Sequence, residues 1–598
     1  MNQNRNLYFS LALLGAVTFS GCTLQQMVKR GKDQQVTVTP NPLEVHADTV
    51  NFQLSAVLPN KTLKKGKVYT VNTFYEYGDQ ELPLEGVEFA AENYQGNQQP
   101  EQKKDFSFAY LPEMQDGDLM VQGVASNPKN QKSRSSSRMK VADGIITTSK
   151  MVKDVNYAAY ADHGYITGEE LEPTNVEFYF EQGSSRLRPS ETRSDRGSFL
   201  GNFIADKNVT KTVTITGTHS PEGPERVNKN LAQDRAEAIE KYYRDQMRRY
   251  DYKGAADSIN FVTKPVVEDW TEFKEMLQGY DKLNQEQKNE VLSIINGQGD
   301  FAEKENRLSR LPYYRTTLFR DVYPQLRTAK TEILTVKDKK PDSEISVLSR
   351  QIATGAVSAD TLSNEELAYS ATLTPSLTER ENIYKSAIKK QDSWQAHSNL
   401  AGTYIEMAQT ADSEEARRKH IENAKTQLEI ASKQQETVEV LSNLAVVQMM
   451  EGNRSRAMST INRASQMETS EATGRGIAGV KGALEIRAAQ YDKAIQTLSR
   501  AEQTPMNLYN KGLAQLLKKD FQNASTTFNE VIKMNNPITQ AEAHYLLAVT
   551  SARMKNENQV TDNLRKAVTA NPELKERALK DAEFLQFSES DNFRGSLR

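Results

Sequence analysis

The sequence predicts a multidomain protein: an N-terminal β-sandwich, a central α/β domain with a helical insertion, and a C-terminal all-α solenoid. Three observations lead to this fold class. Apolar and polar residues alternate in short runs up to about residue 174, strands and helices then alternate, and a helical pattern recurs from about residue 424 onwards. At roughly 150 residues per domain, a chain of 598 residues holds about four domains.

Composition and charge argue against several classes of protein. The net charge is −3, and 37% of the residues are hydrophobic and 26% charged, as in ordinary globular domains. This balance gives no sign of a nucleic-acid partner. Cys22 is the only cysteine, so no intramolecular disulfide forms, and six scattered histidines make a zinc site improbable. We therefore expect neither a metal nor a cofactor.

Residues 1–22 have the layout of a secretion signal. Arg5 lies in a short polar start, and the apolar run from Leu7 to Phe19 is too short to span a bilayer comfortably. The run ends in Phe-Ser-Gly-Cys, which resembles a bacterial lipobox and implies that Cys22 is acylated. The alternative is a plain signal peptide with a chance cysteine. By the same resemblance, Thr23 after the cysteine implies an outer-membrane anchor, which we place on the periplasmic side.

The β-sandwich is predicted from period-two alternation. Val50, Phe52 and Leu54 alternate with polar residues, and Phe106 and Phe108 repeat the pattern further along. Turn sequences separate such runs, as expected for two sheets with polar outer faces. The loop at 129–140 is basic and rich in serine. This is typical of a solvated loop, although contact with an anionic polymer is an alternative.

Strands and helices alternate in the central region. A strand is predicted around residues 176–180, Pro189 suits the first turn of a helix, a second strand covers 211–220, and an amphipathic helix follows over 230–247. On that helix we expect Leu231, Ala238 and Tyr242 to share the apolar face, with Arg235 beside them.

This region resembles the peptidoglycan-binding domain of the OmpA-like family over roughly residues 175–337. The matching residues are Gly217, Gly223, Asn228, Leu231, Arg235 and Ala236. Between the second helix and a closing strand at 327–336, the chain departs from the family pattern with a helical insertion. A polar linker with Pro341 follows.

The resemblance implies a ligand site in which an Asp and an Arg hold the zwitterionic end of a peptide stem. Arg235 occupies the Arg position, but Ser220 stands where the family has Asp. Loss of one charge-assisted hydrogen bond costs about 1.5–3 kcal/mol, or roughly 10- to 150-fold in affinity. Glu222 or Glu225 could partly substitute. Three alternatives stay open: weakened binding, a docking surface without binding, and binding at full strength. The candidate peptidoglycan-binding residues are Arg235, Asn228, Ser220 and Gly223.

The C-terminal region contains a repeat. A small-large-small triplet begins at Ala424, Ala457, Ala494, Ala524 and Val560, a period of about 34 residues. A further small residue lies 12 positions before each of the last four triplets. The spacing resembles the tetratricopeptide repeat, which implies stacked helix pairs whose concave face binds protein segments. Large side chains such as Trp394, Tyr404, Met449 and Phe528 are expected in the core.

These observations divide the chain into a signal peptide (1–21), a lipid anchor and tether (22–35), a β-sandwich (36–174), an OmpA-like domain (175–337), a linker (338–345) and a repeat solenoid (346–598). No catalytic motif stands out, so we expect a non-enzymatic envelope scaffold. Its expected partners are the outer membrane through acyl chains, proteins through the repeats, and peptidoglycan weakly. It would plausibly serve an outer-membrane assembly or secretion machine. The alternative is a full tether between the outer membrane and the cell wall.

Overall fold

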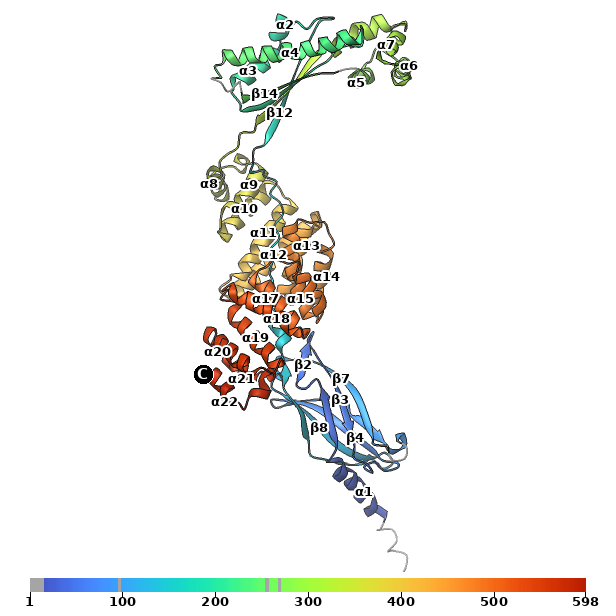
Figure 1. The fold of residues 1–598 in the computed structure, drawn as a ribbon, viewed down its shortest axis with the longest axis vertical. Coiled ribbons are helices and arrows are strands. Elements are labelled where there is room, and N and C mark those ends of the chain that lie inside the picture. Colours follow the sequence, from blue (N-terminus) through green and yellow to red (C-terminus); the bar gives the residue numbers. More distant parts are fainter. Residues whose placement is uncertain (1–15, 95–97, 253–257, 267–269) are drawn as a thin grey trace, which may run out of the picture. The chain divides into compact units, whose positions relative to one another are not determined.

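The computed structural model describes residues 16–94, 98–252, 258–266 and 270–598, which fold into two units (Figure 1). Unit 1 combines residues 1–163 with 345–598 and contains the sandwich and the solenoid. Unit 2, residues 164–344, is inserted between these two parts of unit 1. Most of the predicted signal peptide lies outside the described residues.

The N-terminal part of unit 1 consists of two packed β-sheets, as the alternating pattern predicts. The first sheet contains β1 (Gln35–Thr39), β2 (Leu43–His46), β3 (Thr49–Val57), β7 (Glu101–Ala109) and β11 (Ile145–Ile146). The second contains β4 (Val68–Tyr77), β5 (Gln80–Pro83), β6 (Val87–Ala90), β8 (Asp118–Asn127), β9 (Lys132–Ser135) and β10 (Met139–Asp143). Short 3-10 helices connect them: η1 (Ala91–Asn93), η2 (Pro112–Met114) and, after β11, η3 (Thr148–Met151).

The sandwich core lies between the inner faces of the two sheets. β3 is antiparallel to β7 over its whole length, and its inner residues Val50, Phe52 and Leu54 are at most 4% exposed. Phe106 of β7 stacks on Phe52, with ring centroids 5.0 Å apart. The period-two residues therefore form the core, because alternate side chains of a strand point to the same face.

Residues 22–35, for which the sequence predicts an anchor and tether, include part of a packed helix. α1 (Ala16–Gly31) packs against β8 and β9. Leu24, Met27 and Val28 are 2%, 0% and 4% exposed and belong to the sandwich core. Their spacing of three and four residues places them on one helical face, which is the physical reason for this packing. The anchor position at Cys22 is thus joined to the sandwich without a flexible spacer.

Unit 2 has the predicted order of strands and helices. Its elements are β12 (Leu171–Tyr179), α2 (Pro189–Thr192), α3 (Asp195–Ala205), β13 (Thr210–Gly217), α4 (Glu225–Arg249), β14 (Asn260–Pro265), α5 (Thr271–Gly279), α6 (Gln285–Asn296), α7 (Phe301–Leu308), the π-helix η5 (Tyr314–Val322), η6 (Tyr323–Leu326) and β15 (Thr328–Val336). The sheet order is β12-β15-β13-β14. β12 and β15 are antiparallel neighbours from Leu171↔Val336 to Tyr179↔Thr328, so the unit begins and ends on adjacent strands.

The buried face of α4 is shifted by one residue from the predicted face. Leu231, Ala238 and Tyr242 are only partly buried. Residues of the neighbouring positions, Ala232, Ala236, Ile239 and Tyr243, are at most 1% exposed. The sheet approaches this face closely, because a Cβ on Gly217 would lie 1.9 Å from the Ala232 carbonyl oxygen.

The predicted helical insertion spans α5 to η6, between β14 and β15. It has a hydrophobic core of its own, which includes Trp270, Phe273, Ile295, Leu308 and Tyr323. Ile295 and Leu308 are 2% and 0% exposed. The insertion is therefore a folded subdomain and not an extended loop.

The C-terminal part of unit 1 is an all-α solenoid. Its helices are α8 (Asp342–Ala353), α9 (Asn364–Ser370), α10 (Leu377–Lys390), α11 (Trp394–Gln409), α12 (Glu414–Gln434), α13 (Val438–Met450), α14 (Arg454–Ala464), α15 (Glu471–Arg487), α16 (Tyr491–Leu498), α17 (Pro505–Leu517), α18 (Phe521–Lys533), α19 (Gln540–Arg553), α20 (Glu557–Ala570), α21 (Leu574–Lys580) and α22 (Asp591–Ser596). The 3-10 helices η7 (Ala359–Thr361), η8 (Ala371–Leu373) and η9 (Ala582–Phe587) complete it.

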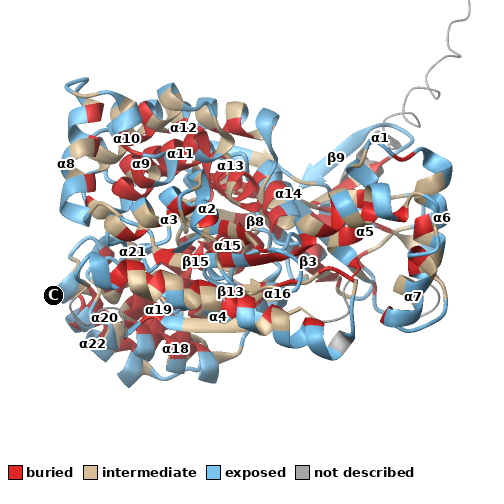
Figure 2. Cartoon of the chain, turned by 90° about the horizontal axis from the view of Figure 1, so that it is seen from above, coloured by how far each residue is buried: buried red, intermediate tan, exposed pale blue. Residues whose placement is uncertain are grey.

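The repeat triplets lie on the second helix of each pair and are buried. All their members are at most 3% exposed, and Tyr404, Met449 and Phe528 are also in the core. Trp394 is only partly buried, because it is the first residue of α11. The small residue upstream lies on the first helix and makes room for the large one. A Cβ on Gly482 would lie 2.4 Å from Leu498, and the neighbour of Gly512 is Phe528. Figure 2 shows buried residues on α11 and α13, as this packing requires.

Two domain boundaries differ from those expected. β12 begins at Leu171, before the predicted start at 175, and α8 begins at Asp342, inside the predicted linker. The sandwich strands end at Ile146 and not at 174. The residues between 152 and 163 belong to neither sheet and pack against the solenoid instead.

We expect Gly512→Ala to destabilise the solenoid by about 1–3 kcal/mol, because the added methyl would overpack the Phe528 ring 2.7 Å away. This outweighs the roughly 1 kcal/mol that alanine normally adds to a helix. The measurement is chemical denaturation followed by circular dichroism. Gly474→Ala is the matched control, because its nearest neighbour is Thr469 at 3.6 Å. Equal stability of the two variants would contradict the packing account.

Candidate functional site

The four candidate peptidoglycan-binding residues lie together at the end of β13 and the start of α4. Ser220 follows the strand, while Asn228 and Arg235 lie on the helix. All three are buried, at 5%, 5% and 1% exposure. Gly223 lies between them with φ +100°, a conformation that suits a residue without a side chain. The structure therefore brings the four predicted residues together.

Asn228 holds the loop in place and does not point to solvent. Its side-chain nitrogen lies 3.4 Å from the Ser220 carbonyl oxygen, 3.1 Å from that of Glu222 and 3.5 Å from that of Gly223. These contacts satisfy backbone acceptors that the turn leaves without a partner in regular structure. Its role in this structure is to shape the loop.

The side chain of Arg235 donates hydrogen bonds to backbone carbonyls. Nε donates to Ser184 O at 3.0 Å, Nη1 to Thr218 O at 2.8 Å and Nη2 to Glu181 O at 3.1 Å. Burial, the largest cause, and the positive charge of Arg327 together lower the pKa of Arg235 to about 10, although Glu222 acts to raise it. The guanidinium thus remains charged at neutral pH but is shielded from solvent.

Arg327, which the sequence did not single out, completes the site. It lies between η6 and β15, and it is 6% exposed. Nε donates to the Ser220 hydroxyl at 3.0 Å, and Nη2 pairs with the Glu222 carboxylate at 2.8 Å. An arginine of the chain therefore uses the positions where the family resemblance implied a bound ligand. Its place at the end of an insertion of unknown fold gave no local signal.

Glu222 provides the nearby carboxylate that the resemblance left open. One of its oxygens pairs with Arg327, and the other is buried with no hydrogen-bond partner among the described residues. The Glu225 side chain lies outside the described atoms. With Ser220 in place of Asp, Glu222 is thus the negative group of the site, and an internal arginine neutralises it.

Glu305 of α7 is a second buried carboxylate of this unit. The hydroxyls of Tyr314 and Tyr323 donate to it. Burial, the largest cause, raises the pKa of Glu305; with the opposing effect of the two tyrosine hydrogen bonds and a smaller rise from the charge of Glu222, the pKa is about 7. Its protonation therefore changes near neutral pH.

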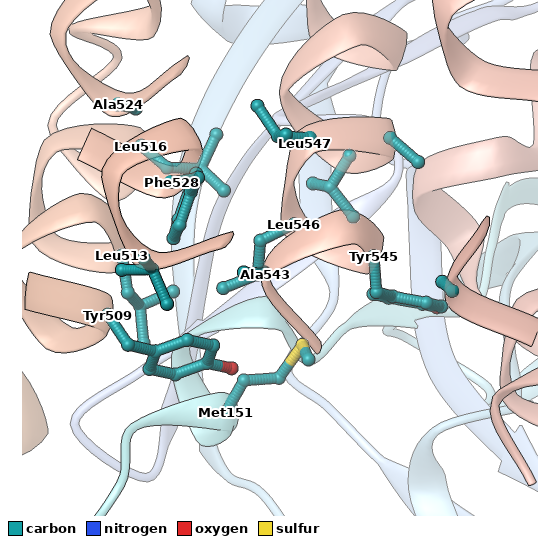
Figure 3. Close-up of a cluster of buried hydrophobic side chains, with 14 of the residues drawn as sticks. Met151, Tyr509, Leu513, Leu516, Ala524, Phe528, Ala543, Tyr545, Leu546 and Leu547 are labelled. Carbon is teal, nitrogen blue, oxygen red and sulfur yellow. The ribbon is translucent and has the colours of Figure 1, made fainter. Parts of the chain in front are cut away.

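A second site lies on the solenoid, along the segment 152–163. The preceding residue, Met151, enters the solenoid core with Val152. Figure 3 shows the Met151 side chain beside Tyr509, in a cluster with Leu513 and Phe528. The segment has no helix or strand of its own. Its polar backbone groups thus need partners from the helices.

Three asparagines supply these partners, one on each of α11, α13 and α17. Each accepts from the N–H and donates to the C=O of a single residue of the segment. Asn399 does so with Ala161 at 2.7 and 3.1 Å, Asn443 with Ala159 at 2.8 Å for both bonds, and Asn510 with Lys153 at 2.9 and 2.8 Å. We call them the asparagine ladder. The segment runs opposite to the order of the repeats.

Side chains add specific contacts to the ladder. Arg487 pairs with Asp154 at 2.6 Å, and the Tyr160 hydroxyl donates to Glu406 at 2.9 Å. The ring of Tyr160 lies over Gly402, where an added Cβ would come within 3.1 Å of it. This surface of the solenoid is therefore complementary to the segment 152–163.

The sequence contained one signal for the ladder. Each asparagine lies two residues before a small position of its first helix: Ala401, Ala445 and Gly512. Asparagine is unfavourable inside helices, so its recurrence at one repeat position indicates a role outside the helix. The partner segment carried no such signal.

We expect Asn443→Ala to lower the hydrogen-exchange protection of the Ala159 amide about 5- to 150-fold. The change removes both partners of a buried residue, at a cost of about 1–3 kcal/mol. Hydrogen exchange with site resolution is the measurement. Asn529→Ala serves as control, because Asn529 is exposed and bonds only to Ser525 of its own helix. Unchanged protection at Ala159 would contradict the ladder.

We also expect unit 2 to lose stability as the pH rises from about 4.5 to about 7. The folded state keeps a proton on Glu305 that the unfolded chain, with an ordinary pKa of 4.5, releases. Its contribution is thus fully present below about pH 4.5 and decreases by up to roughly 3 kcal/mol through pH 7. Calorimetry at acidic and neutral pH should show this loss reduced in Glu305→Gln but not in Glu286→Gln, an exposed control. Identical pH profiles would exclude it.

Comparison with known proteins supports the two recognised modules. A family model described as OmpA family matches residues 179–248. No curated protein matches the chain. Solved structures with similarity include PilF of Pseudomonas aeruginosa (12% identity, 43% of this chain and 98% of that chain, TM-score 0.28). A tetratricopeptide repeat protein from Parabacteroides merdae is another (18% identity, 39% of this chain and 96% of that chain, TM-score 0.25).

Two kinds of feature, a membrane-spanning helix and a metal-ligand cluster, are absent from the described residues. No described helix is long and apolar enough to cross a membrane. Within the same residues, no group of three or more His, Cys, Asp and Glu is placed to hold a metal ion. The chain thus carries an OmpA-family domain, matched over residues 179–248, together with a solenoid of tetratricopeptide-type repeats.

Proposed function

We propose that this chain is a non-enzymatic scaffold of the bacterial cell envelope, anchored by acyl chains on Cys22 to the periplasmic side of the outer membrane. The OmpA-family domain supports an envelope location. The lipobox-like end of the N-terminal segment supports the anchor. The role of an accessory subunit in an outer-membrane assembly or secretion machine fits this combination of modules.

The observation that carries the proposal is the internal pairing of Arg327 with Ser220 and Glu222. A zwitterionic ligand needs an accessible carboxylate for its ammonium and a guanidinium for its carboxylate. Glu222 is already neutralised, and Arg235 is 1% exposed. A ligand must therefore displace Arg327 before it binds, so peptidoglycan contact is weak or residual.

Protein partners bind the repeats outside the surface that carries the asparagine ladder. The asparagine ladder holds the segment 152–163 on that surface, and each of its three bonded residues would lose two hydrogen bonds on exchange. A competing peptide would have to replace them all. Partner contact therefore uses the remaining solenoid surface. The surface that carries the asparagine ladder instead joins the sandwich to the solenoid.

The alternative function, a full tether to the cell wall, has one supporting observation. Asn228 and Gly223 keep the family loop, and Glu222 lies close enough to interact with Arg235. Movement of Arg327 would leave a carboxylate and a guanidinium side by side. The two functions thus differ in how readily Arg327 leaves.

Co-sedimentation of the mature chain with purified sacculi distinguishes them. We expect a small pelleted fraction for the wild type, an increase of about 10-fold or more in affinity for Arg327→Gln, and loss of binding for Arg235→Ala. Ser220→Asp combined with Arg327→Gln should bind most tightly. Arg310→Gln, at an exposed arginine of the insertion, controls for the change of charge.

Strong wild-type binding that does not respond to Arg327→Gln would favour the full tether and contradict the proposal. Absence of binding in every variant, including the Ser220→Asp combination, would show that the domain has lost peptidoglycan contact altogether.

A further inference from the structure

The lysines and arginines of the sandwich fall into two groups. One group lies in residues 29–32, 61–67 and 129–134, which we call the basic end. The other, Lys103, Lys104, Arg138, Lys140 and Lys150, is spread over the rest of the sandwich, and each member pairs with a carboxylate. Among the described residues, no salt bridge involves any side chain of the basic end.

The topology brings the three ranges of the basic end together. Residues 29–32 close α1 just before β1, whose first residue Gln35 pairs with Val57 at the end of β3. Residues 61–67 lead into β4, and Val68 pairs with Ser126 near the end of β8. Residues 129–134 form the turn from β8 into β9, against which α1 packs. All three therefore lie at one end of the two sheets, beside α1 (Figure 1).

Direct contacts support this placement. The Arg30 guanidinium donates to the Lys61 carbonyl oxygen at 2.6 Å, which joins the first range to the second. Lys29, Lys32, Lys65 and Lys132 are exposed. The basic charges thus crowd around one helix with their ammonium groups in water.

Acidic residues do not balance this charge. Near it lie Asp33, Glu92 and Glu101; Glu101 pairs with Lys103, and Glu92 accepts from the Gly66 N–H. The Lys65 charge contributes to the lowered pKa of Glu92, although that backbone bond is the larger cause. At the other end of the sandwich, the turns carry Asp79, Asp116 and Asp118. The sandwich therefore has opposite charge at its two ends.

The anchor lies at the basic end. Seven helical residues separate Cys22 from Lys29, a rise of roughly 10 Å. This is close to the screening length of about 8 Å at physiological ionic strength. Leu24 and Met27 fix α1 to the sandwich. An acylated Cys22 would therefore hold the basic end close to the bilayer surface.

We propose that the basic end is a membrane-docking surface that binds the anionic phospholipid headgroups of the bilayer beside the anchor. Unpaired, exposed lysines and arginines complement a negatively charged leaflet, at about 1 kcal/mol for each residue near the surface. The orientation towards the bilayer rests on the acylation of Cys22 in the proposed function. The charge pattern itself does not depend on it.

The test is flotation of the mature chain with vesicles of phosphatidylcholine, with or without phosphatidylglycerol. The chain carries Cys22→Ser and therefore no acyl group. We expect the chain to bind only those vesicles that contain phosphatidylglycerol, and we expect salt to weaken this binding. Lys61→Gln, Lys65→Gln and Lys132→Gln together should reduce the partition coefficient about 100-fold, at roughly 5-fold for each lysine. The matched control replaces Arg418, Lys419 and Lys433, exposed on α12, by Gln.

Three results would overturn the proposal: equal binding to both vesicles, equal loss in the two triple variants, or no binding at low salt. Displacement by inorganic phosphate at constant ionic strength would also do so, because it indicates a site for single phosphate groups. Acylation of Cys22 is tested by a separate experiment, so its failure can be told apart from failure of membrane docking. That experiment measures the mass of the chain purified from cells with and without Cys22→Ser.

Discussion

The arrangement of unit 1 depends on how the backbone of residues 152–163 is hydrogen-bonded. An extended segment between helices has no neighbouring strand, and each buried N–H or C=O without a partner costs stability. An asparagine amide carries a donor and an acceptor, so a single side chain satisfies both groups of one residue. Three such pairs fix the segment along the repeats. Because the segment continues directly from Met151, they also hold the sandwich against the solenoid.

The OmpA-family domain shows how a binding module can retain its shape while its charges are used internally. Arg235 ties together three backbone carbonyls from two loops, so the fold itself requires its guanidinium. The insertion then supplies Arg327, whose charge is balanced by Glu222. Ser220 suits this arrangement because a hydroxyl accepts a hydrogen bond without adding a second negative charge. The serine and the insertion therefore belong to one structural change.

Periodic features were predictable from the sequence, and contacts between distant segments were not. The repeat triplets and the alternation in β3 follow from local geometry, so their burial is confirmed. The face of α4 was misplaced by one residue because Leu231 and Tyr242 are apolar but lie at its edge. Arg327 and the segment 152–163 make their contacts 107 and up to 357 residues away, which no local pattern encodes. The helix α1 was overlooked because its first residues lie within the signal-like segment.

The pairing of β12 with β15 has a consequence for the history of the chain. A host domain loses conformational entropy when it closes a long connection, and the loss depends on how far apart the ends of that connection lie. Here the ends of the inserted unit are neighbouring strands, so its 164–344 span acts on the host as a short loop would. Acquisition or removal of the whole unit would leave the remaining fold intact. Selection could therefore modify the inserted unit independently of the rest.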